Sequence, residues 1–230
     1  TANAGMYQAL EPIEEQIKTA ILASDVVHFD ETGMRVEKKL HWFHVASTSW
    51  FTYLFVHKKR GREALNSEDS LLKDFQNQAV HDCWESYFGF EQCQHALCGA
   101  HLLRELTNLV EQGLKWAAKM HQFILDLYQN SQKATVTLAD RQSWEREFRH
   151  ICQLADQEEP PPKQGKRGKP KNSKGRNLLN RLLNHQDEWL AFAFVEGVPF
   201  SNNQAERDIR CLKTKQKVAT NFQTFNRIFF

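Results

Sequence analysis

Three short strands with brief connections constrain the fold of this chain most strongly. Residues 26–30, 40–46 and 51–56 are rich in β-branched and aromatic side chains, as strands are. A Thr-Gly pair at 32–33 follows the first run as a turn signal, and residues 47–49 join the second run to the third. Such short connections between consecutive strands predict an antiparallel meander.

Alternating elements follow this meander. The pattern predicts a helix over 63–75, a short buried strand over 78–83, another strand over 94–98 and a helix over 101–112. This order predicts an α/β fold, a mixed sheet flanked by helices, as in ribonuclease-H-like proteins. In that arrangement the first and fourth strands lie side by side at the centre of the sheet.

The rest of the chain reads as helices. Apolar spacing predicts one helix over 6–22 and three more over 114–129, 138–155 and 177–195. A Pro/Gly/Lys-rich loop at 158–176 cannot bury an apolar core. A last helix is expected to begin at Ser201, because Gln204 three residues later completes a capping-box pattern.

Composition excludes several classes of protein. The chain has 230 residues, 41% hydrophobic and 25% charged, which is ordinary for a soluble globular protein. No apolar run approaches the ~20 residues that cross a bilayer, and no leader is visible, so we expect a cytoplasmic location and no membrane partner. Five scattered Cys do not suggest a disulfide framework. A net charge of +2 does not by itself indicate nucleic-acid binding.

Three acidic residues stand where chemistry can be placed. Asp30 and Asp82 lie at the apparent ends of strands, and Glu206 lies on the last helix. Carboxylate oxygens are the hard ligands that Mg²⁺ prefers. Two bound cations can activate a nucleophile and stabilise a leaving oxygen in phosphoryl transfer. Glu31 would point to the other face of its strand, so we do not expect it to be a ligand.

Structural interpretations of the same residues remain open. Asp30 could begin an Asx-turn, Asp82 could cap its strand, and Glu206 could pair with Arg210 one helical turn later.

A different set of residues could bind zinc. Cys93, Cys98 and His101 have a spacing that zinc could use, but a fourth ligand is not obvious.

Six stretches taken together resemble one family of proteins, the transposases of the insertion sequence 66 family, which are bacterial DDE transposases. The resemblance extends over about residues 10–225. The matching stretches are His-Phe-Asp-Glu-Thr-Gly at 28–33, Leu-His-Trp-Phe-His-Val-Ala-Ser-Thr at 40–48, His-Lys-Lys-Arg-Gly at 57–61, Val-His-Asp-Cys-Trp at 80–84, Ala-Leu-Cys-Gly-Ala-His-Leu-Leu-Arg-Glu-Leu at 96–106 and Asn-Asn-Gln-Ala-Glu-Arg at 202–207.

The resemblance implies a function and a site. Asp30, Asp82 and Glu206 would form the acidic triad and hold two Mg²⁺ ions, with Mn²⁺ as a substitute. The implied activity is metal-dependent cleavage of transposon ends followed by strand transfer into target DNA. The implied partners are both of these DNAs and further copies of the chain in a homo-oligomer. The expected location is the bacterial cytoplasm, at the nucleoid when DNA is bound.

The resemblance also implies a domain organisation. Residues 1–22 would be a helix leading from an absent region that recognises transposon ends, and 23–113 would be the first part of the catalytic core. Residues 114–198 would be a helical insertion, and 199–230 the last part of the core. The chain begins without Met and departs from the family pattern after residue 225, so we expect a fragment altered at its end.

Basic clusters offer a surface for DNA phosphates that the net charge conceals. One cluster follows the third strand, one occupies the loop at 158–176, and one lies on the last helix. The motif residues of two helices add polar side chains. The expected DNA contacts are Lys58, Lys59, Arg60, Arg62, His101, Arg104, Asn202, Asn203, Arg207, Arg210 and Lys213. Nothing in these clusters reads bases, so binding should be largely independent of sequence; solvated surface residues are the alternative.

Two other functions compete with an active transposase. One is a truncated, catalytically inactive remnant that keeps its affinity for DNA and inhibits transposition. The other is a ribonuclease-H-like nuclease such as a junction resolvase. Cleavage of branched DNA without strand transfer would favour the resolvase.

Overall fold

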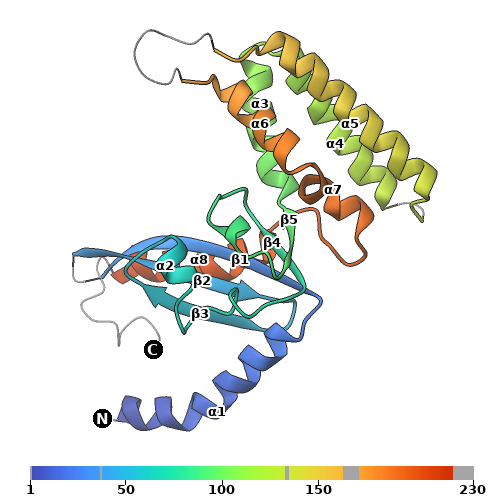
Figure 1. Ribbon diagram of the computed structural model, residues 1–230. Helices are drawn as coiled ribbons and strands as arrows, with labels where there is room; N and C mark the ends of the chain where they lie inside the picture. The colour runs from blue at the N-terminus through green and yellow to red at the C-terminus, as the bar shows by residue number, and fades with distance from the viewer. Residues whose placement is uncertain (1, 37, 133–134, 163–170, 220–230) are drawn as a thin grey trace. The chain divides into compact units, whose positions relative to one another are not determined.

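The computed structural model describes residues 2–36, 38–132, 135–162 and 171–219. The chain forms two compact units, one made of residues 1–95 and 202–230 and the other of residues 96–201. The first unit carries the sheet, and the second is almost entirely helical (Figure 1). Residues 163–170 of the predicted basic loop and the chain end from 220 lie outside the described residues.

Five strands form one mixed sheet in the order β3-β2-β1-β4-β5. Strand β1 pairs antiparallel with β2, β2 pairs antiparallel with β3, and β1 pairs parallel with β4. The predicted meander and the predicted contact between the first and fourth strands are therefore confirmed. The strands are β1 (Val26–Val36), β2 (Lys39–Ser47), β3 (Thr52–His57), β4 (Gln78–His81) and β5 (Gln94–Leu97).

Strand β1 is longer than its sequence predicts. It continues through the Thr-Gly pair to Val36, and Gly33 pairs with Trp42 of β2. Lys38, with a φ of 64°, lies between the two strands. The predicted turn at 32–33 is wrong because Met34 and Val36 are both buried on one face of the strand. This alternation of buried residues outweighs the local preference of glycine for a turn.

The helix predicted over 63–75 is also wrong in extent. Helix α2 comprises only Arg62–Leu65, and a series of turns follows it. Leu71, Leu72 and Phe75 are still buried in the core beneath the sheet. A 3-10 turn, η1 (Tyr87–Gly89), lies between β4 and β5. The apolar residues of this segment are therefore placed by packing against the sheet rather than by a helical period.

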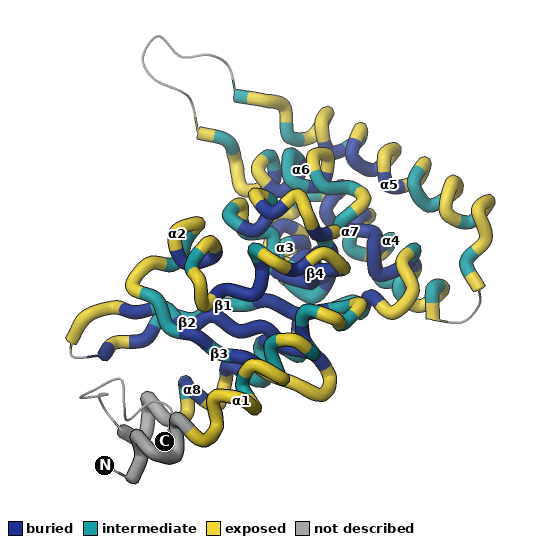
Figure 2. Tube along the Cα trace, turned by 60° about the horizontal axis from the view of Figure 1, so that its bottom comes forward, coloured by how far each residue is buried: buried dark blue, intermediate teal, exposed yellow. Residues whose placement is uncertain are grey.

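Each face of the sheet has its own core, and the residues of strands β1 and β2 are mostly buried or half-buried (Figure 2). One core joins alternate strand residues such as Phe29 and Phe55 to Ile21 of α1 (Ala2–Leu22). The opposite core joins Met34, Val36, Phe43 and Val45 to α8 (Asn203–Ala219) through Ala205, Ile209 and Leu212. The two-residue alternation of strands therefore fixes α8 against β1 and β2.

The helical unit buries aromatic residues from several helices. Trp116, Phe148 and Trp189 are each at most 1% exposed, as expected for core residues. The single helix predicted over 177–195 is two helices, because the backbone leaves helical geometry at His185, where φ is −132° and ψ is 40°. The helices are α3 (Gly99–Glu111), α4 (Lys115–Ser131), α5 (Leu138–Glu158), α6 (Lys174–Asn184) and α7 (Gln186–Phe194).

No helix among the described residues is both long and apolar enough to span a bilayer.

Candidate active site

Asp30 lies in the middle of the sheet on the central strand β1. Because strand residues alternate, its side chain shares a face with His28 and with the buried Met34, the face that α8 covers. One carboxylate oxygen, Oδ1, accepts the backbone N–H of Glu31 at 2.8 Å. The strand continues through this point, so Asp30 does not begin the turn that one interpretation of the sequence required.

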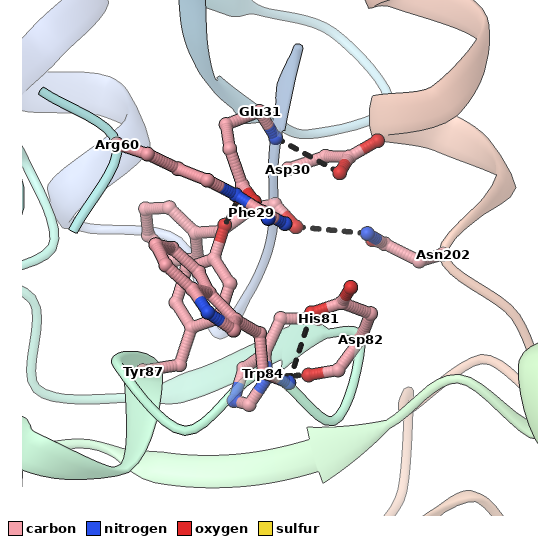
Figure 3. A network of polar contacts seen from close by, with 9 residues as sticks. All are labelled: Phe29, Asp30, Glu31, Arg60, His81, Asp82, Trp84, Tyr87 and Asn202. Carbon is pink, nitrogen blue, oxygen red and sulfur yellow. Dashed lines mark hydrogen bonds and ion pairs between the residues drawn. The ribbon is translucent and has the colours of Figure 1, made fainter. Parts of the chain in front are cut away.

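Asp82 directly follows β4, the parallel neighbour of β1. Its Oδ1 accepts the backbone N–H of Trp84 at 3.0 Å, a local bond of the Asx-turn kind. In Figure 3 the carboxylates of Asp30 and Asp82 both lie on the side of β1 from which Asn202 approaches. The parallel pairing of β1 and β4 thus brings the two acidic side chains together just beyond the last paired residues, His28 and Val80.

Glu206 lies in the first turn of α8, and its charge reaches Asp30. Burial raises the pKa of Asp30 to about 7, with further raising by the charges of Glu31, Asp82 and Glu206 and an opposing effect of the Glu31 N–H. The pKa of a carboxyl rises in this way when other carboxylates are close. The structure therefore brings Asp30, Asp82 and Glu206 close enough for the charges of Asp82 and Glu206 to act on Asp30.

Glu31 points away from this cluster, as the alternation of the strand predicts. Its side chain is only 2% exposed, and it pairs with Arg60 at 2.7 Å and accepts the hydroxyl of Tyr87. Burial raises the pKa of Glu31, although the bonds from Tyr87 and Arg60 act in the opposite direction. Both carboxylate oxygens of Glu31 are thus engaged by protein groups, which leaves it unsuited to bind a cation.

Sequence reasoning missed this pairing and assigned Arg60 to DNA. The guanidinium of Arg60 instead contacts Glu31 and lies over the rings of Trp42 and Trp84, at 5.0 Å and 4.3 Å from their centroids. One feature of the sequence could have revealed the pairing of Arg60 with Glu31. A Glu on the core-facing side of a strand requires a buried partner, and Arg is the side chain best suited to a carboxylate.

Asn202 has a position that does not fit the phosphate contact predicted for it. It is 1% exposed, and its Nδ2 donates to the carbonyl of Phe29 at 2.8 Å. Its Oδ1 accepts from Nδ1 of His28 at 2.9 Å. The paired register of β1 and β4 ends at His28, so Asn202 supplies a donor just where that pairing stops. The residue before α8 therefore ties the helix that carries Glu206 to the strand that carries Asp30.

Replacing Asn202 by Ala should destabilise the sheet unit. Loss of the amide removes a donor from the buried Phe29 carbonyl, which costs about 1–3 kcal/mol of the free energy of unfolding. Urea unfolding followed by fluorescence would measure this change. Asn203→Ala is the matched control, because Asn203 is exposed and its substitution should stay within about 0.5 kcal/mol of wild type. Equal unfolding midpoints for the two variants would contradict this role.

The other predicted DNA contacts differ in their surroundings. Lys58, Lys59, Arg62, Asn203, Arg207 and Arg210 are exposed. Lys213 is half-buried, and its Nζ donates to the carbonyl of Gly33 at 2.6 Å. His101 and Arg104 belong to α3 in the helical unit, where Arg104 is exposed and His101 is half-buried. Of these exposed basic side chains, Lys58 and Lys59 lie on the loop after β3, Arg62 begins α2, and Arg207 and Arg210 lie on α8.

The zinc interpretation loses support at Cys93. Its thiol is buried in the core and donates to the carbonyl of Phe90 at 3.3 Å. Burial raises the pKa of Cys93 to about 11, which disfavours the thiolate that zinc binds.

The chain is thus a mixed α/β protein whose candidate site consists of three acidic side chains with interacting charges beside the central strand of the sheet. A family model described as Transposase IS66 family matches residues 2–226. The chain belongs to this family, which makes it a transposase-type DNA-processing protein with DNA as its partner. No curated protein and no solved structure matches the chain.

Proposed function

We propose that the chain contains the ribonuclease-H-like catalytic core of a DDE transposase, interrupted by a helical insertion. The strand order and the parallel pairing of β1 with β4 support this fold assignment. The position of α8 on the sheet after an intervening helical unit supports the insertion. In this proposal the core comprises residues 23–113 and 199–230, and the insertion comprises residues 114–198.

One observation carries the catalytic proposal. Asp30 is held beside Asp82 and Glu206 although burial and the charges of these neighbours raise the pKa of Asp30 to about 7. Carboxylates that repel one another lower the stability of the protein when no cation is bound. Grouped carboxylates are also the side chains that bind divalent cations. Transposases of the DDE type generally use divalent metals. A cation site would explain why these mutually repelling carboxylates lie together.

Asp30, Asp82 and Glu206 would hold two Mg²⁺ or Mn²⁺ ions. Bound there, the ions supply charge stabilisation and activation of the attacking oxygen in phosphoryl transfer. The backbone N–H groups of Glu31 and Trp84 orient the two Asp carboxylates. Carboxylates oriented in this way would position the cations for that chemistry, and positioning is a large part of what a protein contributes to phosphoryl transfer.

The exposed cations of the sheet unit would hold the DNA backbone. Four of these side chains are exposed and can reach DNA phosphates. They are Lys58 and Lys59 on the loop after β3, and Arg207 and Arg210 on α8. Glu206 lies beside Arg207, so the last helix would carry both a metal ligand and phosphate contacts. Transposon ends and target DNA are the proposed substrates, and a homo-oligomer at the bacterial nucleoid is the proposed active form.

Incubation with supercoiled plasmid in Mg²⁺ or Mn²⁺ tests this function. Nicked circles should appear with either ion and should not appear in EDTA. Oligonucleotides that end in a free 3′-hydroxyl should become joined to plasmid, which separates strand transfer from simple cleavage.

Two outcomes would replace the proposal. Salt-sensitive DNA binding without nicking in either metal would identify an inactive remnant. Cleavage of four-way junctions without joining of the oligonucleotides would identify a resolvase-type nuclease.

A further inference from the structure

Arg60 contacts the two residues whose backbones hold the proposed metal-binding Asp side chains. The N–H of Glu31 donates to Asp30 at 2.8 Å, and the N–H of Trp84 donates to Asp82 at 3.0 Å. The Arg60 guanidinium binds the carboxylate of Glu31 and lies over the ring of Trp84. Figure 3 shows Arg60, Glu31, Tyr87 and Trp84 grouped on one side of β1, with Asp30, Asp82 and Asn202 on the other.

The pairing of Arg60 with Glu31 is strong enough to fix geometry. Nε and Nη2 of Arg60 both bind Oε1 of Glu31, at 2.8 Å and 2.7 Å, and the Tyr87 hydroxyl donates to Oε2. The Glu31 side chain is 2% exposed. A buried carboxylate is costly to leave unpaired, so Arg60 and Tyr87 hold Glu31 in a single position. The Glu31 N–H is then fixed relative to Asp30.

The aromatic contacts of Arg60 extend this constraint to the neighbouring segments. Trp42 belongs to β2, Arg60 follows β3, and Trp84 follows Asp82 after β4. The guanidinium lies 5.0 Å from the Trp42 centroid and 4.3 Å from the Trp84 centroid, close enough for cation–π attraction. The ring of Trp84 also packs edge-on against Tyr87. One cation thus links the loop after β4 to β1 and β2.

These contacts assign Arg60 a role different from that of its lysine neighbours. Lys58 and Lys59 are exposed, whereas Arg60 is half-buried and its guanidinium is already bound to the Glu31 carboxylate. A guanidinium whose charge is matched by Glu31 contributes little to binding phosphate. We propose that Arg60 is a positioning residue that, through Glu31 and Trp84, sets the separation and orientation of Asp30 and Asp82 for divalent cations. This inference rests on the proposed cation site.

Direct Mn²⁺ binding, followed by the electron paramagnetic resonance signal of free Mn²⁺, tests the role of Arg60 without requiring turnover. Arg60→Ala should weaken Mn²⁺ binding by roughly 10-fold or more, as loss of partners around a metal ligand does. Tyr87→Phe should weaken it less, because Glu31 keeps its ion pair. Arg60→Lys should not restore wild-type affinity, since an ammonium lacks the planar fork and the stacking of a guanidinium.

DNA affinity measured over a range of salt concentrations separates positioning from phosphate contact. Lys59→Ala should lower the slope of affinity against salt by about one unit and leave Mn²⁺ binding unchanged. Arg60→Ala should leave that slope unchanged. The opposite pattern, a lower slope with intact Mn²⁺ affinity in Arg60→Ala, would overturn the inference and make Arg60 a DNA contact.

A double variant guards against misfolding, because Arg60→Ala leaves Glu31 buried without its cation. Arg60→Gln combined with Glu31→Gln removes both charges and keeps hydrogen-bonding groups, so the fold should survive. The inference requires weakened Mn²⁺ binding in this variant also, and wild-type affinity there would overturn it. If wild-type protein itself binds no Mn²⁺ at millimolar concentration, the proposed cation site fails, and the role of Arg60 fails with it.

Discussion

Glu206→Gln should lower metal-dependent nicking of supercoiled DNA by more than 100-fold while DNA binding persists. Replacement of groups around a metal ligand already costs roughly 10–100-fold in affinity or activity, and loss of a ligand charge should cost more. The amide has nearly the shape of the carboxylate, so the first turn of α8 should remain intact. Nicking rates at fixed Mg²⁺ and filter binding of the same DNA would measure the two quantities.

Asp82→Asn should share this defect, because Asp82 is also a proposed cation ligand. Glu63→Gln is the matched control, since Glu63 is an exposed acidic residue in the first turn of a helix of the same unit. Its nicking rate should equal that of wild type. Undiminished nicking by purified Asp82→Asn and Glu206→Gln would mean that cleavage occurs at a different site or comes from a contaminant.

Asp30→Asn should stabilise the metal-free protein at alkaline pH while abolishing its activity. Burial and neighbouring charges raise the pKa of Asp30 from 3.8 to about 7. Each unit of difference corresponds to about 1.4 kcal/mol, so ionised Asp30 costs the native state on the order of 4 kcal/mol. Asparagine avoids this cost and can still accept the Glu31 N–H.

The dependence of this gain on pH follows from the direction of the pKa change. Between about pH 4 and pH 7 the native protein keeps a proton on Asp30 that the unfolded chain has lost. The free energy of unfolding contributed by Asp30 is therefore highest below pH 4, falls across this window and is fully lost above pH 7. The advantage of Asp30→Asn should be about 2–3 kcal/mol larger at pH 8 than at pH 5.

Urea unfolding of both proteins at these two pH values, in EDTA, would measure the effect. Asp74→Asn is a suitable control, because the Asp74 side chain is 62% exposed and its substitution should change stability little at either pH. Added Mn²⁺ should raise the stability of wild type and leave Asp30→Asn unchanged. An Asp30→Asn variant that is less stable than wild type at pH 8 would contradict the burial of a charged cluster.

Much of the sheet could be predicted from the sequence because its signals are local. Short connections predict the antiparallel meander, and the ribonuclease-H-like order of elements predicts the contact between the first and fourth strands. The Thr-Gly pair at 32–33 and the apolar run at 63–75 misled for a common reason. In both places burial against the sheet decides the conformation, and the local propensities of these residues do not.

The acidic residues of the candidate site could be predicted from the sequence, but the contacts that support them could not. Asp30, Asp82 and Glu206 stand out as acidic residues beside predicted strands and on a predicted helix, although β1 continues past Asp30 to Val36. Asn202 and Arg60 lie within polar, basic stretches that resemble a solvated surface, yet one is buried and the other pairs with a buried carboxylate. Pairings between residues so distant along the chain, such as Asn202 with Phe29, depend on the finished packing of α8 on the sheet.

The location of bound Mn²⁺ tests the central claim most directly. Crystals of the protein soaked in Mn²⁺ would reveal each ion by its anomalous scattering. Peaks between the carboxylates of Asp30 and Asp82, with Glu206 completing the ligand set, are the expected result, and they should vanish in Asp30→Asn. Ions bound only at places that exclude Asp30 and Asp82, in protein that still nicks DNA, would contradict the assignment of the site.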